Sequence, residues 1–318
     1  MARCRPWHAE TRAAGDDVNH EAGLTLVEIL VAMVIVLVVV AASTAFITRG
    51  RAAHRTSEAM AQVEESLDAG FSMLADEVRL AGYLGLAPPA TAVAGSSTLG
   101  SAERADLAVS GSCGKSLAHD LESPVAAVNS GYAAAPGVPL GCRASPDGRP
   151  APATDTLVLR HATAEAGRAQ AGRLQLETNL RSAVLAANGI ATLGADTRWH
   201  DLEVGVYYVS RDSTDRRNWP SLRRKRLVGG TRPAFQDEEL VSGIADLQVT
   251  IGLDDPADLD ADVDRWINPG EPALGGTPRA LRIELEAQSD IPEPGLPGMT
   301  RRKRASRIVE LRNTAAAR

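Results

Sequence analysis

Aromatic residues are scarce in this chain of 318 residues, which has three Phe, four Tyr and four Trp. The apolar content of 44% is nevertheless ordinary for a folded protein, so the core must be built from Ala, Val, Leu and Ile. An excess of positive charge is also missing, because the formal net charge is −6. This charge argues against binding of nucleic acid or of an anionic membrane by the whole molecular surface.

Motifs of catalysis are missing as well. The six histidines show no metal-ligand spacing such as H-E-x-x-H, and no arrangement of serine, cysteine and histidine stands out. The run Gly111–Ser116 resembles a phosphate-binding loop, but Val109 stands where such a loop needs its first glycine. The sequence therefore predicts that the chain is not an enzyme and has no cofactor, apart from the calcium ion considered below.

Cysteine is rare too, with three residues in the whole chain. Cys4 precedes a long apolar segment, whereas Cys113 and Cys142 follow it, and this suits a protein whose two parts lie in different redox compartments. A Cys113–Cys142 disulfide would close a loop of about 30 residues and stabilise the fold by about 3–4 kcal/mol in the chain-entropy model. Two free thiols are the alternative.

The most informative feature that is present is the apolar segment near the N-terminus. Residues 29–47 contain no formal charge, and these 19 residues are enough for a transmembrane helix. Glu28 stands directly before them. A charged side chain at the centre of such a helix costs about 2.5–3.5 kcal/mol on insertion scales, and less near the interface. The sequence thus predicts a partner for this carboxylate, or else a side chain that snorkels to the membrane surface.

Helical periodicity continues beyond the apolar segment. Apolar residues recur at spacings of three and four, with acidic residues between them: Met60, Val63, Leu67, Phe71, Leu74 and Val78. Gly82 and Gly85 interrupt the pattern, and Pro88-Pro89 prevents its continuation. A helix from Leu24 to Gly82 would be about 90 Å long at 1.5 Å per residue.

The rest of the chain reads as β-structure. Residues 86–153 are rich in Ala, Gly, Ser and Pro and predict loops with short elements. Six β-favouring runs follow, separated by turn residues: Thr156–Arg160, Arg173–Leu176, Leu202–Ser210, Ile244–Leu253, Ala280–Ala287 and Ser306–Leu311. No periodic helix separates them, which favours an antiparallel sheet. Packing the amphipathic helix on this sheet would cover the apolar faces of both.

An acidic run raises the question of calcium. Asp258-x-Asp260-x-Asp262, with Asp254 nearby, has an alternation that can place oxygens around Ca²⁺. Val263 and Pro269 stand where an EF-hand needs its glycine and its bidentate glutamate. A solvated acidic turn between strands is the alternative.

Two basic clusters also occur, Arg223–Arg226 and Arg301–Arg304. Contact with nucleic-acid phosphates is one interpretation. Solvated loops, or strand edges protected from aggregation, are the favoured interpretation, because no aromatic residue for base stacking lies beside either cluster.

The residues from Gly23 onward resemble the prepilin motif of type IV pilins and type II secretion pseudopilins: Gly23-Leu24-Thr25-Leu26-Val27-Glu28, followed by the apolar helix. In that family a prepilin peptidase cuts after the glycine and methylates the new amino terminus. The resemblance implies a cut between Gly23 and Leu24. It also implies that Glu28 meets the N-terminal amine of a neighbouring subunit during assembly, since a buried carboxylate is tolerable when paired with a cation.

Three further stretches resemble the PilW-type minor pilins: residues 81–85, 239–249 and 307–313. The resemblance implies an α+β, type IV pilin-like fold, with a long N-terminal helix that is first transmembrane and then amphipathic and that packs on an antiparallel β-sheet. The expected parts are a leader (1–23), a transmembrane helix (24–48), an amphipathic helix (49–84) and a globular domain (85–318).

The function implied is that of a minor pilin that helps to prime assembly of a type IV pilus, near its tip. Its expected partners are other minor pilins, the major pilin, the prepilin peptidase, the inner-membrane assembly platform and membrane lipid. The positive-inside rule leaves the orientation open, with three arginines on each side of the apolar segment, but the resemblance implies an inner-membrane protein with a periplasmic C-terminal domain. The alternatives are a minor pseudopilin of a type II secretion system and a membrane-anchored enzyme or binding protein.

Overall fold

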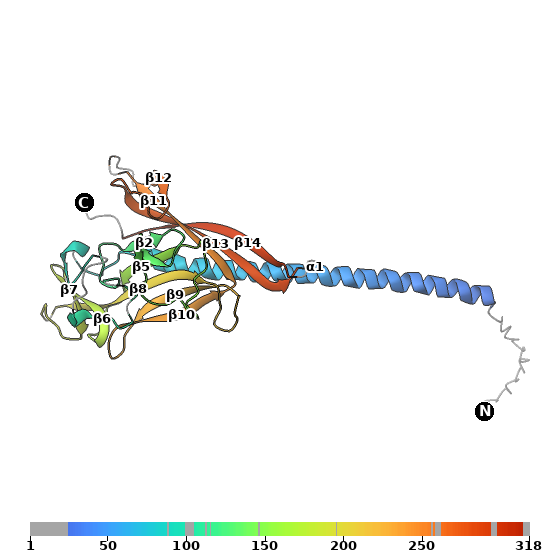
Figure 1. Cartoon of the computed structure of the whole chain (residues 1–318), viewed down its shortest axis with the longest axis horizontal. Helices are drawn as coiled ribbons and strands as arrows, with labels where there is room; N and C mark the ends of the chain where they lie inside the picture. The colour runs from blue at the N-terminus through green and yellow to red at the C-terminus, as the bar shows by residue number, and fades with distance from the viewer. Residues whose placement is uncertain are drawn as a thin grey trace, which may run out of the picture. The chain divides into compact units, whose positions relative to one another are not determined.

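The computed structural model describes residues 25–87, 89–98, 105–111, 113–114, 116–145, 147–194, 196–255, 257, 262–293 and 298–313. The chain divides into two compact units, Met1–Ala53 and His54–Arg318. Helix α1 (Leu26–Leu80) contributes to both (Figure 1). Gly23, Leu24, Asp258 and Asp260 lie outside the described residues.

Helix α1 begins and ends close to the positions that the sequence predicts. At its start the hydroxyl of Thr25 accepts a hydrogen bond from the N–H of Glu28 (3.3 Å), and the Glu28 carboxylate favours the positive end of the helix dipole. At its other end Gly82 takes φ = +82°, a conformation that favours glycine. A side chain there would also meet the carbonyl oxygen of Asn313 at 2.9 Å.

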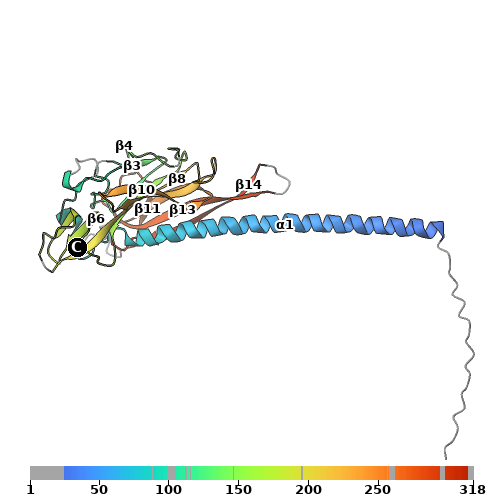
Figure 2. The same cartoon turned by 90° about the horizontal axis from the view of Figure 1, so that it is seen from below.

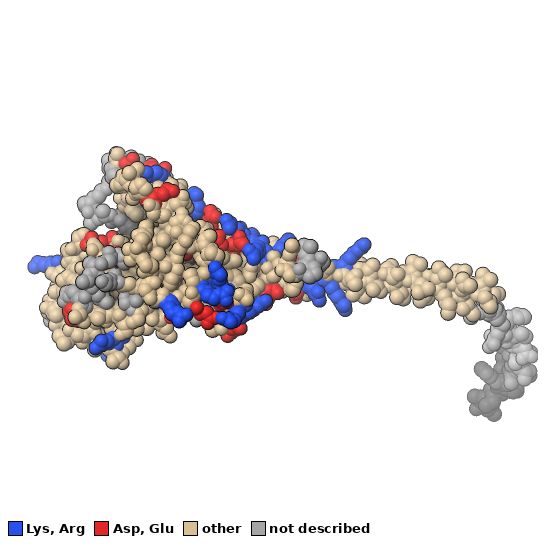
Figure 3. All heavy atoms as spheres, viewed as in Figure 1, with Lys and Arg blue, Asp and Glu red and all other residues tan. Residues whose placement is uncertain are grey.

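In the first unit, α1 is apolar and fully exposed. The side chains from Leu26 to Ile47 are all exposed, and in the described chain α1 is the one helix that is long and apolar enough to cross a membrane. On the face drawn in Figure 3, the apolar stretch of this helix shows no charged side chain, and basic side chains appear where the stretch ends. Exposed apolar surface of this extent needs lipid or other protein to cover it.

The second unit contains a sheet of eight strands. Its main path runs β1 (Val93–Ala94), β7 (Ala183–Asn188), β6 (Ala171–Thr178), β8 (Arg198–Ser210), β5 (Thr156–Ala162), β2 (Val125–Val128). In addition β9 (Ser221–Val228) pairs with β8, and β10 (Ala234–Ser242) pairs with β9. All of these pairs are antiparallel except β1–β7, which is parallel. The antiparallel prediction therefore holds for the sheet apart from one two-residue strand.

A second, four-stranded antiparallel sheet has the order β12 (Arg265–Ile267), β11 (Ile244–Asp254), β13 (Thr277–Pro292), β14 (Thr300–Glu310). The remaining short elements are the pair β3 (Ala133–Ala135) and β4 (Val138–Pro139) and the 3₁₀ turns η1 (Ala90–Ala92) and η2 (Ala105–Leu107). Gly243 is the single residue between β10 and β11, so the chain passes there from one sheet to the other.

The part of α1 that belongs to the second unit is shared by the cores of both sheets. Leu67, Phe71 and Leu74 are buried together with Leu157 of β5 and Leu285 of β13. Figure 2 shows this part of the helix running alongside β13 and β14. The predicted packing of an amphipathic helix on a sheet is thus extended to two sheets.

The backbone continues directly from α1 into the larger sheet. Gly82 N–H donates to the carbonyl of Arg160 in β5 (2.9 Å), and Ala162 N–H donates to the carbonyl of Tyr83 (2.6 Å). The side-chain amide of Asn313, after the last strand, donates to the carbonyl of Arg79 (3.0 Å). The end of the helix is therefore tied to an inner strand of one sheet and to the chain segment that leaves the other.

The protein is richer in β-structure than the sequence predicts. Six strands were expected, whereas the described residues form fourteen. The basic run Arg223–Arg226 was interpreted as a loop or a strand edge, but it lies inside β9, which has a neighbour on each side. Four consecutive cations conceal the apolar–polar alternation by which a strand is recognised in a sequence. Their burial is tolerable only because carboxylates of the neighbouring strands pair with them.

Candidate functional site

Glu28 lies in the first turn of α1. It is the only charged residue from Thr25 to Ile47, and its side chain is exposed. No cation contacts its carboxylate among the described residues, and Leu24, whose amine is its expected partner in a neighbouring subunit, lies outside them. Within the described part of this chain Glu28 has no cationic partner, so its pairing in assembly stays a prediction.

A half-buried charged cluster lies where α1 meets the larger sheet. Glu77 places one carboxylate oxygen 3.0 Å from His161 Nε2 (β5) and the other 2.9 Å from Arg224 Nη1 (β9). The other ring nitrogen of His161, Nδ1, lies 2.9 Å from the carbonyl oxygen of Ala162. Because both ring nitrogens face acceptors, the geometry suits a doubly protonated, cationic imidazole. Three elements far apart in the sequence are joined by this cluster.

The cluster changes the pKa values of its members in opposite directions. Burial by itself would raise the pKa of Glu77, but the hydrogen bond and charge of His161, with the charge of Arg224, outweigh it and hold that pKa below its usual value. Burial would likewise lower the pKa of His161, but the hydrogen bonds to Glu77 and Ala162 and the charge of Glu77 outweigh it and raise that pKa.

We expect the stability of the protein to depend on pH through this cluster. The contribution of His161 is complete below its unfolded-state pKa of about 6.5 and disappears as the pH rises through its higher folded-state pKa. Replacing His161 by Gln should cost about 1.5–3 kcal/mol at pH 6, typical of a hydrogen bond between charged groups, and less at pH 9. Urea denaturation of the full chain in mild detergent at several pH values measures this difference.

His54 offers a matched control, since it pairs with Glu58 one turn along the same helix but is 74% exposed. The His54→Gln variant should differ little from the wild type at every pH. A His161→Gln difference that stays constant from pH 6 to 9 would contradict the assignment of a cationic imidazole.

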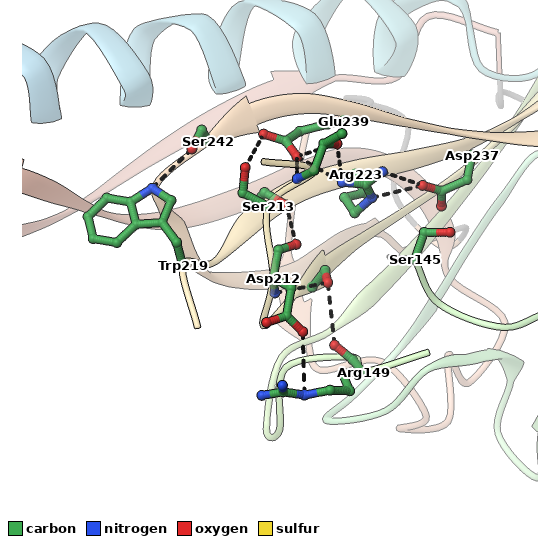
Figure 4. Close-up of polar contacts among 12 residues, drawn as sticks. Ser145, Arg149, Asp212, Ser213, Trp219, Arg223, Asp237, Glu239 and Ser242 are labelled. Carbon is green, nitrogen blue, oxygen red and sulfur yellow. Dashed lines mark hydrogen bonds and ion pairs between the residues drawn. The ribbon is translucent and has the colours of Figure 1, made fainter. Parts of the chain in front are cut away.

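The basic residues of β9 are neutralised by the neighbouring strands. Arg223 is buried between Asp237 (2.7 Å) and Glu239 (2.8 Å) of β10, as Figure 4 shows. The other three cations have carboxylate partners as well: Arg224 with Glu238, Lys225 with Asp237, and Arg226 with Glu203. These cations are therefore occupied within the chain rather than presented to phosphates.

The turn between β8 and β9 is held by the same network. Asp212 is fully buried, accepts a hydrogen bond from the N–H of Asn218 (2.7 Å) and lies 3.4 Å from Arg149 Nε. Trp219 follows at the end of the turn, and its indole N–H donates to the hydroxyl of Ser242 (3.0 Å), also visible in Figure 4. This bond ties the turn to the last residue of β10.

Gly243 then makes the passage between the sheets. It has φ = +84°, and a side chain on it would lie 2.9 Å from the carbonyl oxygen of Gln288 in β13. Its N–H donates to the carbonyl of Pro220 (2.8 Å), and its own carbonyl accepts from Gln288 N–H (2.8 Å). The position therefore requires glycine for both conformation and space.

The second basic cluster lies on β14, the edge strand of the smaller sheet. Its four cations have partners on both faces of that sheet: Arg301 with Glu293, Arg302 with Glu286, Lys303 with Glu64 of α1, and Arg304 with Asp246 and Glu286. The interpretation as a charged strand edge agrees with this position. On the face drawn in Figure 3, basic and acidic side chains accordingly lie side by side rather than in a patch of one sign.

Two restraints hold the irregular region before β5. Cys113 and Cys142 are joined by a disulfide, and Cys113 is fully buried. Arg160 of β5 donates from Nε to the carbonyl of Leu117 (2.8 Å) and from Nη1 to that of Ser123 (2.5 Å). Burial lowers the pKa of Arg160 to about 10.

The acidic run is only partly described. Asp254 is buried, and its Oδ2 atom accepts from Arg279 Nη2 (2.5 Å) and Nε (2.7 Å). Asp262 is described, whereas Asp258 and Asp260 lie outside the described residues. In the part of the chain that is described, no three His, Cys, Asp or Glu side chains are grouped so that they could hold a metal ion. Calcium binding stays a prediction.

Comparison with known families adds an independent observation. The family model described as Type IV Pilus-assembly protein W matches residues 206–290, and the model of the prokaryotic N-terminal methylation motif matches residues 18–44. The chain thus carries a segment similar to the PilW family and a prepilin-type N-terminal motif. No curated protein and no solved structure matches it.

The two matches cover some of the features described above. The methylation-motif match includes Gly23, Leu24 and Glu28 and most of the apolar part of α1. The PilW match runs from β8 into β13, and so includes the Arg223 network, Trp219 and Gly243. The matches therefore support a type IV pilus-related, pilin-like protein.

Sequence reasoning missed the cluster of Glu77, His161 and Arg224. A signal for Glu77 was present, because it lies between Leu74 and Val78 of the apolar stripe and so at the margin of the buried face. No comparable signal pointed to His161, whose neighbours in the strand are apolar or basic. Trp219 and Gly243 were also missed as members of one junction.

Proposed function

We propose that this protein is a minor pilin that takes part in priming assembly of a type IV pilus. One observation carries the proposal: helix α1 has two different halves. Its first half contains Glu28 and matches the methylation motif, and its second half packs into the core of the β-region, part of which matches the PilW family. The apolar half supplies lateral contact with other pilin helices. The β-region supplies contacts that select particular partners.

In this proposal the prepilin peptidase cuts between Gly23 and Leu24 and methylates the Leu24 amine. The mature chain spans the inner membrane once, with its β-region in the periplasm, before it enters the pilus. The Cys113–Cys142 disulfide supports this placement, because disulfides persist in the oxidising periplasm. The partners are other minor pilins, the major pilin and the inner-membrane assembly platform. The PilW match favours a pilus over a type II secretion system.

The processing step has a direct test. Mass spectrometry of the chain isolated from host membranes should find Leu24 as its first residue, carrying an N-methyl group. Replacing Gly23 by a bulky residue such as Leu should leave the whole chain uncut and absent from sheared pili. An Ala22→Ser variant is the matched control and should be cut normally. A mature chain that still begins at Met1 would remove the basis of the proposal.

A further inference from the structure

The two flanks of α1 in the second unit differ in how they are covered. On one flank Glu64 pairs with Lys303 and Asp68 pairs with Arg307, both of β14. The guanidinium of Arg307 also lies 4.9 Å from the ring centre of Phe71. This flank is closed by the edge strand of the smaller sheet.

The opposite flank is open. There a groove of about 350 Å³ lies between α1 and the junction of the two sheets. Its lining includes Glu65, Ser66 and Ala69 of the helix, with Trp219 and Gly243 across from them and Asp290 at the end of β13. The small residues and the missing side chain of Gly243 keep the groove free. The same Gly243 and Trp219 form the junction between β10 and β11 described above.

The charge of the groove is of one sign. Glu65 and Asp290 are exposed carboxylates, and neither has an ion-pair partner among the described residues. Among the described residues, no Lys or Arg lines the groove. This contrasts with the carboxylates of β10 and of the closed flank, which are matched to cations within the chain. The groove is thus electrostatically complementary to a cationic group from outside.

The helix of this chain shows which cations could fill the groove. In this chain Arg49, Arg51 and Arg55 follow the apolar segment, are exposed, and have no carboxylate partner in the described part of the chain. Long Arg and Lys side chains can lay their apolar stems along a surface that includes Trp219 and Ala69 while the charged heads reach Glu65 and Asp290.

We infer that this groove is the docking site for the cationic segment of a neighbouring pilin-type helix. The inference rests on the proposed function, since it requires neighbouring pilin subunits. It goes further by assigning the contact to one flank of α1 and by naming the groups on both sides. The groove residues Trp219, Gly243 and Asp290 all lie within the stretch matched by the PilW family model.

Site-specific photocross-linking in the full chain tests the inference. A photoreactive residue replaces Ala69 in the groove, or Asp76 on the exposed face of the same helix as the control, and cross-links are formed in host membranes. The expected result is an adduct from position 69 with a chain that has a prepilin-type helix, mapped to the cationic stretch of that helix. Position 76 should give little of this adduct.

Charge reversal supplies the second part of the test. The double variant Glu65→Lys, Asp290→Lys should reduce the adduct about tenfold, the effect expected when charge pairs at an interface become repulsive. Asp76→Lys should leave it unchanged. Retention of the Cys113–Cys142 disulfide and of the tryptophan fluorescence of the wild type shows that the variants fold.

The outcomes separate the two proposals. Suppose first that the wild-type chain is present in sheared pili. The groove assignment is then wrong, while the pilin function stands, if position 69 gives no adduct or gives one with lipid or a non-pilin protein. It is also wrong if the adduct is insensitive to charge reversal. If the wild-type chain is processed and membrane-bound but never found in pili, the proposed function fails, and the groove assignment fails with it.

Discussion

Replacing Glu28 by Ala should leave this protein in the membrane and remove it from the pilus. Insertion becomes easier, since a carboxylate within the apolar helix costs up to about 2.5–3.5 kcal/mol on insertion scales and alanine has no such cost. Assembly becomes harder, because the N-terminal amine of the neighbouring subunit would then be buried without its partner, which costs about 3–5 kcal/mol when one member of a buried pair is removed. A loss of this size corresponds to a reduction of at least about 100-fold in the assembled fraction.

Immunoblots of membranes and of sheared pili measure the two effects separately. Glu58→Ala is the matched control, because Glu58 lies on the exposed face of the same helix, beyond the apolar segment, and pairs with the exposed His54. That variant should reach the pilus in normal amounts. Normal incorporation of the Glu28→Ala chain would show that Glu28 is a snorkelling side chain and would refute its pairing in assembly.

The largest effect on folding is expected at Arg223. Its guanidinium is buried between Asp237 and Glu239, and Tyr208 also donates to Asp237 (2.5 Å). Replacement by Met preserves the length of the side chain but leaves two partly buried carboxylates without their main cation. The free energy of unfolding should fall by about 3–5 kcal/mol, as is usual when one partner of a buried ion pair is removed.

Urea denaturation of the full chain in mild detergent, followed by tryptophan fluorescence, measures this loss. The m-value should stay unchanged if the folded state keeps its compactness. Arg217→Met serves as the control, since Arg217 is 74% exposed in its ion pair with Asp147, and the change there should stay within about 0.5 kcal/mol. A loss below about 1 kcal/mol in Arg223→Met would mean that Lys225 alone satisfies Asp237.

Elements with a regular apolar pattern could be predicted from the sequence. The helix was expected from Leu24 to Gly82 and extends from Leu26 to Leu80, and the strand expected at Ile244–Leu253 is β11, Ile244–Asp254. In both cases the period of the apolar residues alone identifies the element and its buried face. The prepilin-type residues around Glu28 were likewise visible in the sequence, because their spacing is local.

Features that depend on partners distant in the sequence could not be predicted. Strand β9 has four consecutive cations, and its burial makes sense only with the carboxylates of β10 and β8 beside it. The cluster of Glu77, His161 and Arg224 joins a helix to two strands. The groove beside Glu65 exists because one flank of α1 faces β14 and the other does not. Each of these three features depends on how the two sheets and the helix are arranged in space, and a local sequence pattern does not encode that arrangement.

The attachment of α1 has a mechanical consequence. A pilus subunit pulled through its N-terminal helix would transmit tension along α1 to Gly82, whose N–H bonds to β5, and to Asn313, which bonds to the carbonyl of Arg79. The helix also shares buried side chains with both sheets. Load would therefore be shared by many bonds and contacts at once. The helix through which force would enter is thus held to both sheets along its buried face and at its C-terminal end.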